Sequence, residues 1–172
     1  MTASLSRIPV GIVVERRNSN SPWLDVVWLP VAVLGGIPDA APWTVLLSEG
    51  EASTFYAGAA EIELYRSETG NYRDNLNSGM PSIWISLQAT GEDPPYEIAA
   101  VTADPAEGES LTEAGSAIVE AVAMPEPIRE AIAAFVSQHH VETVFQKRKR
   151  SRADPEVMAR RGPHRGNDDD RS

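Results

Sequence analysis

Apolar residues recur at every second position in parts of the first hundred residues, and this spacing constrains the fold more than any other feature of the chain. At positions 8–14 and again at 83–87, every second residue is Ile, Val or Leu. Successive side chains of a β-strand point to opposite faces, so these stretches predict strands with one buried face. Residues 26–34 are apolar at both parities, which predicts a strand buried on both faces, with Pro30 at an edge or a bulge.

Further segments predict the rest of the strands. Short runs typical of strands occur at residues 43–47, 55–65, 96–102 and 118–122. The apolar parity switches within 55–65, and Gly58 is a suitable position for the β-bulge that such a switch requires. Residues 91–95 predict the turn of a hairpin between 83–88 and 96–102, and residues 16–22 predict a polar turn.

Helix signals come mainly in the second half of the chain. Residues 67–79 predict a polar helical turn, and Asp104 with Pro105 predicts a helix start, although Gly108 and Gly115 favour a short, weak helix. Apolar residues at 3–4 spacing from 128 to 139 predict an amphipathic helix. The predicted fold class is α+β, mainly β: an antiparallel sheet or small barrel with a C-terminal amphipathic helix. It forms a single globular domain over residues 7–145.

Charge divides the chain in two. Residues 1–144 hold 6 Arg, no Lys and 20 acidic residues, a net charge of −14, whereas residues 145–172 have a net charge of +4. An acidic body repels polyanions, so contact with nucleic acid is expected only from the tail. Residues 146–172 are predicted to be a disordered, basic-then-acidic tail. Its basic cluster would either fold back on the acidic domain or contact RNA, anionic lipid or an acidic protein through Lys147, Arg148, Lys149, Arg150 and Arg152.

Composition excludes several classes of protein. Cysteine is absent, which excludes disulfides, thiolate metal sites and cysteine nucleophiles. The sequence has no run of ~18 apolar residues that would predict a membrane span. The first residues also lack the apolar stretch of a secretory signal. We therefore expect a cytoplasmic protein without a membrane span.

The histidines are the main candidates for metal binding or acid–base chemistry. His139 and Glu142 would share one side of a continuing helix, and imidazole with carboxylate could bind zinc or iron. Beyond His140, the remaining histidine is His164 in the tail, so such a site would need further carboxylates from the sheet. The alternative role for His139 is a helix-end histidine that complements the helix dipole. No serine shows the signature of an activated nucleophile, so we expect no catalytic residues and no cofactor.

Arginines and aromatic residues together predict a recognition surface. Four of the six arginines before residue 145 lie at expected strand ends. Tryptophans at a sheet edge beside such arginines would form a protein-binding hot spot. Together with the segment at the helix end, the predicted partner-binding residues are Arg16, Arg17, Trp23, Arg66, Tyr72, Arg73, His139, His140, Glu142 and Phe145.

Several short stretches carry a resemblance to a known family. They include Glu15-Arg16-Arg17, Pro22-Trp23, Phe55-Tyr56-Ala57-Gly58, residues 62–69, Val101-Thr102-Ala103-Asp104-Pro105 and residues 135–142. Over about residues 7–150, the chain resembles a family of uncharacterised proteobacterial proteins, a domain of unknown function often encoded beside formate dehydrogenase and other molybdoenzyme genes. Some members carry the name molybdopterin-guanine dinucleotide biosynthesis protein A. The resemblance implies a molybdoenzyme setting rather than nucleotidyl transfer, because residues 10–15 lack a Gly-rich loop and no lysine precedes Lys147.

Three functions remain open at this point. The first is a non-catalytic accessory protein that binds a protein partner, a formate dehydrogenase subunit or its maturation machinery, during maturation or assembly of a molybdoenzyme. The second is a nucleic-acid-associated protein that uses the basic tail, with binding that falls steeply as salt rises. The third is a metal-dependent enzyme built on His139, His140 and Glu142.

Overall fold

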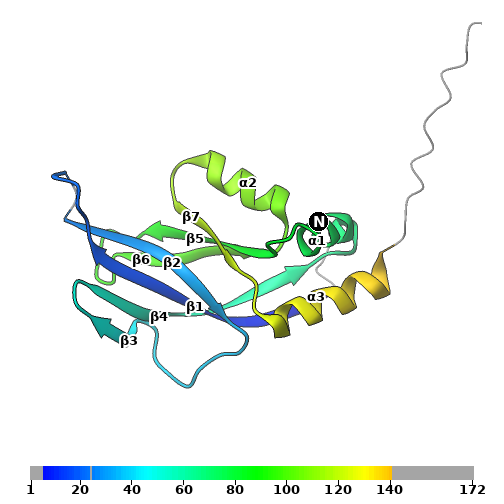
Figure 1. Ribbon diagram of the computed structural model, residues 1–172, viewed down its shortest axis with the longest axis horizontal. Coiled ribbons are helices and arrows are strands. Elements are labelled where there is room, and N and C mark those ends of the chain that lie inside the picture. Colours follow the sequence, from blue (N-terminus) through cyan, green and yellow to red (C-terminus); the bar gives the residue numbers. More distant parts are fainter. Residues whose placement is uncertain (1–5, 24, 141–172) are drawn as a thin grey trace, which may run out of the picture. The chain divides into compact units, whose positions relative to one another are not determined.

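The chain forms two antiparallel β-sheets and three α-helices in the computed structural model, which describes residues 6–23 and 25–140 (Figure 1). The first sheet has the strand order β2-β1-β4-β3 and the second has the order β6-β5-β7. The strands are β1 (Ser6–Asn18), β2 (Val26–Leu34), β3 (Thr44–Glu49), β4 (Ala52–Leu64), β5 (Ser82–Ala89), β6 (Tyr96–Thr102) and β7 (Ile118–Ala123). The helical segments are the 3-10 turn η1 (Arg66–Glu68) and helices α1 (Thr69–Leu76), α2 (Pro105–Ala114) and α3 (Glu126–His139).

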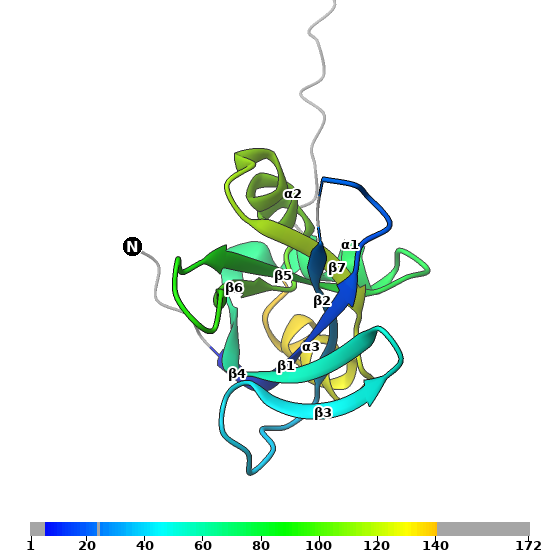
Figure 2. The ribbon, with the colours of Figure 1, turned by 90° about the vertical axis from the view of Figure 1, so that its left-hand side faces the viewer.

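The hydrophobic core lies between the two sheets, with α3 visible between them in Figure 2. The alternating residues of the two central strands, Val10, Ile12, Val14, Ile83, Ile85 and Leu87, are all completely buried. Tyr72 of α1 and Ile128, Ile132 and Phe135 of α3 belong to the same core cluster. The α+β, mainly β prediction is therefore confirmed. Among the described residues the two sheets do not join into a closed barrel, so the small-barrel alternative does not hold.

Two irregularities predicted from the sequence occur in the first sheet. Ile12 is opposite Gly58 and Val13 is opposite Tyr56, so β4 has one extra residue at this point. Gly58 has a φ of +140°, a backbone conformation that favours glycine, and this confirms the predicted bulge. On the other side of β1, the register shifts between Val13 and Val14, and Pro30 lies there on the edge strand β2.

Two strand predictions need correction. The predicted polar turn at 16–22 begins too early, because β1 continues to Asn18 and its last residues pair with both β2 and β4. Strand β2 is not buried on both faces, because Val31 is 40% exposed and most of the other residues of the strand are only half-buried. The pattern of apolar and polar residues does not predict where β1 ends, because pairing with strands on both sides can hold polar residues in a strand.

Helix α2 packs against the outer face of strand β5. Asp104 caps the helix by accepting a hydrogen bond from the Ala106 amide, and Gly115 ends the helix in the left-handed conformation. Gly108 faces the Trp84 ring so closely that a Cβ atom at Gly108 would lie 2.4 Å from Trp84 Cγ. No helix in residues 6–23 and 25–140 is long and apolar enough to cross a membrane.

Tyr72 fixes helix α1 to the core. Its side chain is 1% exposed, its ring packs against Phe135, and its hydroxyl accepts a hydrogen bond of 3.0 Å from the Tyr65 amide. Burial raises the pKa of the Tyr72 phenol to about 12 from its ordinary value of 10.0, although the bond from the Tyr65 amide acts in the opposite direction.

The raised pKa of Tyr72 predicts a loss of stability at high pH. Because the folded chain holds this proton more strongly than the unfolded chain, the stabilisation is complete below pH 10 and is lost as the pH rises toward 12. Urea unfolding between pH 8 and pH 12 should therefore show a falling midpoint above pH 10. Tyr72→Phe should be less stable at neutral pH, by about 1 kcal/mol, and should show a weaker decline at high pH. A decline equal to that of the wild type would contradict this assignment.

Candidate functional site

The predicted recognition residues fall into two groups at opposite ends of strand β1. Arg16 and Arg17 lie near its end, where it pairs with β2, and the β1–β2 turn carries Trp23. At the other end Ser6 pairs with Leu64, the last residue of β4, just before η1 and α1. A strand of 13 residues spans about 40 Å. The predicted single surface therefore does not form, as Figure 1 shows by the separation of the β1–β2 turn from α1 and α3.

The first group lies near the tip of the hairpin that β1 and β2 form. The guanidinium of Arg16 lies over the ring of Trp28, 5.8 Å from its centroid, which is a cation–π geometry. Trp28 also contacts Trp43 edge-to-face at 5.9 Å and Phe55 at 5.6 Å. These tryptophans and Phe55 are half-buried, so Arg16 lies on a preformed aromatic cluster.

Trp23 is the most exposed large apolar residue of the described chain, at 89%. Its amide donates to the Ser21 hydroxyl at 3.3 Å, and the Ser21 amide donates to the Ser19 hydroxyl at 3.0 Å. The Asn18 amide donates to the Glu51 carbonyl at 3.3 Å, which joins this turn to the β3–β4 turn. We call Arg16, Arg17, Trp23 and Trp28 the hairpin-tip surface.

The second group lies where α3 ends beside α1. His140 Nε2 lies 3.3 Å from Arg73 Nη1, and His140 Nδ1 lies 3.0 Å from the Thr69 hydroxyl. A guanidinium can only donate, so Nε2 accepts and the neutral imidazole donates from Nδ1 to Thr69. The Thr69 hydroxyl in turn donates to the Arg66 carbonyl at 3.3 Å. His140 therefore joins the end of α3 to the start of α1.

Two of the predicted recognition residues in this group have structural roles. Tyr72 is buried in the core, so it is not available to a partner, and its assignment to the recognition surface is corrected. The ring of His139 packs against Phe135 at 4.6 Å, and its buried Nδ1 has no hydrogen-bond partner within the part of the chain that the structure describes.

The His139–Glu142 metal site stays a prediction, because Glu142 lies outside the described residues. Helix α3 ends at His139, and His140 is already extended with a ψ of 113°. Glu142, Phe145 and the tail residues from Lys147 to Arg152 lie outside the described residues. So do the predicted domain boundary at 145 and the predicted tail over 146–172. Within residues 6–23 and 25–140, no three His, Asp or Glu side chains gather in a way that could hold a metal ion.

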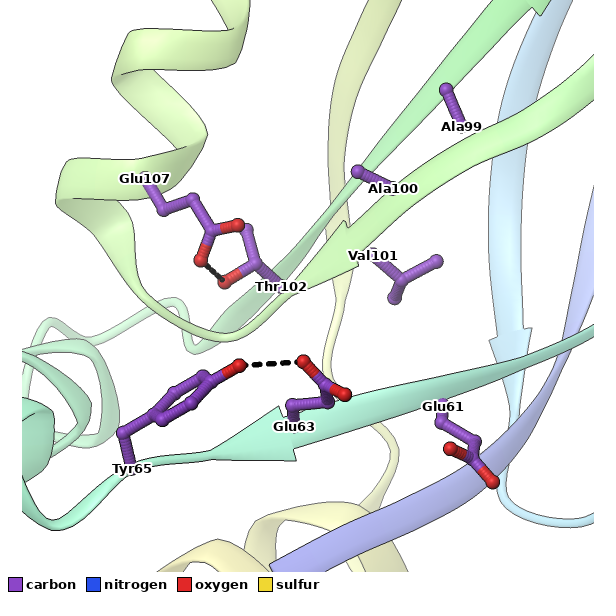
Figure 3. A pocket seen from close by; sticks show the side chains of 8 residues that line it. All are labelled: Glu61, Glu63, Tyr65, Ala99, Ala100, Val101, Thr102 and Glu107. Atoms are coloured by element: carbon purple, nitrogen blue, oxygen red, sulfur yellow. Dashed lines mark hydrogen bonds between the residues drawn. The ribbon is translucent and has the colours of Figure 1, made fainter. Parts of the chain in front are cut away.

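A cleft of about 250 Å³ lies between the end of β4, strand β6 and the start of α2 (Figure 3). Its carboxylates belong to Glu61, Glu63 and Glu107. The Tyr65 hydroxyl donates to Glu63 at 2.6 Å, and this bond raises the pKa of Tyr65. Thr102 donates to Glu107 at 2.9 Å, and Arg7 lies 3.6 Å from Glu63. These carboxylates are already paired with groups of the protein: Glu61 and Glu63 with Arg7, Glu63 also with Tyr65, and Glu107 with Thr102.

Comparison with known proteins places the chain in a family. The model of one family, described as Protein of unknown function (DUF3305), matches residues 9–149. The chain belongs to this family. No curated protein and no solved structure matches the chain of this DUF3305 protein. The family match confirms that the chain belongs to an uncharacterised family, a domain of unknown function, whereas the molybdoenzyme setting stays a prediction.

The family match includes every element of the DUF3305 chain from β2 to α3 and most of β1. It therefore contains both groups of predicted recognition residues. Sequence reasoning missed one further exposed feature, the apolar residues Val45, Leu46 and Leu47 of β3. Three apolar residues in a row were a signal for this strand, but an apolar run predicts burial and not exposure.

Proposed function

We propose that this DUF3305 protein is a non-catalytic accessory protein that binds a protein partner during maturation or assembly of a molybdoenzyme. Formate dehydrogenase is the first candidate for this enzyme. The observation that carries the binding role is the hairpin-tip surface, where an 89% exposed tryptophan lies on the same hairpin as an arginine stacked on a second tryptophan. Tryptophan and arginine are the residue types most enriched in the hot spots of protein interfaces.

The molybdoenzyme setting rests on the sequence resemblance described above, and the proposal places the protein in the cytoplasm with its partner. The nucleic-acid and metal-enzyme alternatives depend on Lys147 to Arg152 and on Glu142, which lie outside the described residues. Both alternatives are therefore treated as outcomes of the experiment that tests the accessory role.

The prediction is that the hairpin-tip surface carries partner binding. Trp23→Ala and Arg16→Glu should each reduce co-purification of a formate dehydrogenase subunit by about tenfold or more, because truncating a hot-spot side chain commonly costs ~2 kcal/mol. Trp23 is 89% exposed, so its removal should leave the fold intact. The measurement is a native pull-down of tagged full-length protein from cells that express formate dehydrogenase, with quantitative mass spectrometry of the eluates.

Arg66→Glu provides the matched control, because Arg66 is exposed and lies at the opposite end of β1. Loss of the partner in this variant alone would move the recognition surface to α1 and His140.

A copy truncated after Phe145 tests the tail. RNA or ribosomal proteins that are recovered only with the tail would favour the nucleic-acid alternative, and stoichiometric zinc or iron in the purified protein would favour the metal enzyme.

A further inference from the structure

Strand β3 is an open edge of the first sheet. In the described residues it pairs only with β4, so one side of its backbone has no strand beside it. All six residues from Thr44 to Glu49 are exposed. An edge strand of this kind presents unpaired N–H and C=O groups that can add a strand from another chain.

The side chains of β3 differ from those of a protected edge. Val45, Leu46 and Leu47 are 55%, 47% and 54% exposed, and Glu49 is the one charged residue among Thr44–Glu49. Natural sheets usually protect such edges with charged residues or proline. The other edge strand of this sheet, β2, carries Pro30.

The register gives both faces of this edge an apolar side chain. Val45 is opposite Phe55, and Leu47 is opposite Thr54, with the register shift between them. Directly opposite residues share a face, so Val45 lies on the same face as Phe55, which contacts Trp28 of the hairpin-tip surface. An added strand would therefore meet apolar side chains on both of its own faces.

Charge argues against a second copy of this chain as the occupant. Residues 1–144 have a net charge of −14, and two such bodies repel each other. The exposed carboxylate of Glu49 at the end of the strand, and those of Asp39 and Glu51 that flank the strand in the sequence, instead favour a positively charged occupant.

We propose that the edge of β3 binds an extended apolar segment of a partner protein that has lysine or arginine at its ends, by addition of a strand. This rests on the proposed function, that the protein recognises another protein, and names the chemistry of what it recognises. Backbone hydrogen bonds along Thr44–Glu49 supply affinity, and the apolar side chains with the flanking carboxylates supply selectivity.

The test is a titration of the full-length protein with the synthetic peptide KKVTVTVKK, followed by backbone amide NMR and hydrogen exchange. We expect saturable shifts concentrated at residues 44–49 and about tenfold slower exchange of amides in this strand. The peptides EEVTVTVEE and KKVTPTVKK should bind at least about tenfold more weakly, because the first reverses the charge and the second removes an N–H from the strand.

Leu46→Lys tests the edge itself and should weaken binding of KKVTVTVKK by about tenfold, because a lysine protects an edge strand. Val31→Lys makes the same change at an exposed apolar residue of the other edge strand and should leave binding unchanged.

Shifts outside β3, equal binding of EEVTVTVEE, or self-association that protects β3 without peptide would each overturn the proposal. If Trp23→Ala reduces co-purification of the partner but KKVTVTVKK does not bind β3, the proposal for strand β3 fails and the proposed function stands.

Discussion

Gly108→Ala is expected to lower the free energy of unfolding by about 2 kcal/mol, because the ~3 kcal/mol upper end of the usual cost of overpacking a core is offset by the gain of about 1 kcal/mol in helix propensity of alanine over glycine. A Cβ atom at Gly108 would lie 2.4, 2.5 and 2.6 Å from three carbons of the Trp84 ring. Either the Trp84 ring or helix α2 must therefore move. Alanine gains about 1 kcal/mol in helix propensity over glycine, so the measured loss is the net of these two effects.

Gly70→Ala is the matched control for this substitution. Gly70 lies in helix α1, and a Cβ atom there would meet nothing within 4 Å. This variant should be as stable as the wild type or more stable, by up to about 1 kcal/mol. Urea denaturation of both variants gives the comparison, and Trp84→Leu in the Gly108→Ala background should recover part of the loss. Equal stability of Gly108→Ala and the wild type would contradict the close packing of α2 on β5.

Gly108 also shows the limit of propensity as a guide to this fold. On sequence alone it indicates a weak helix, because glycine disfavours helices. The structure gives it a packing role, since only glycine leaves room for Trp84. Propensity is a local property, whereas the distance between a helix and a strand is set by the rest of the chain.

The sequence predicted strands well where one face of the strand is buried. It predicted them less well where pairing with distant strands determines which residues are exposed. Alternation at residues 8–14 and 83–87 placed two central strands, because burial of one face imposes a period of two. Pro30 indicated an edge or a bulge for β2, but nothing in the sequence showed that β3 lies at an edge, since strand order is a long-range property. The exposure of Val45, Leu46 and Leu47 follows from that order.

The candidate site was predicted in part for a related reason. Arginine and tryptophan content identified the residues of the hairpin-tip surface, but not which of them meet. Arg16 reaches Trp28 because the two residues are directly opposite each other in β1 and β2. Arg66 lies at the far end, beyond the last residue of β4. Tyr72 was assigned to the surface by its residue type, whereas its burial depends on packing with Phe135 of α3, an element distant in the sequence.

Asn75→Ala is expected to cost about 4 kcal/mol of folding free energy, because each buried polar group left without a partner costs ~1–3 kcal/mol. Asn75 is 3% exposed. Its amide nitrogen donates to the Ser82 carbonyl at 2.8 Å and to the Ala103 carbonyl at 3.0 Å. Its side-chain oxygen accepts from the Ser82 amide at 3.0 Å. One side chain thus joins α1 to the start of β5 and to the residue after β6.

Asn75→Asp distinguishes the contribution of these hydrogen bonds to stability from that of packing. Aspartate has nearly the same shape as asparagine, but an ionised carboxylate cannot donate to the Ser82 and Ala103 carbonyls. We expect it to be at least as destabilising as Asn75→Ala at neutral pH. Asn77→Ala is the control, since Asn77 is exposed at the end of the same helix and should change stability by less than about 0.5 kcal/mol. Urea denaturation of the three variants is the measurement. If Asn75→Asp retained wild-type stability, shape rather than hydrogen bonding would hold α1 to the second sheet, and the three bonds of Asn75 would not explain the position of this helix.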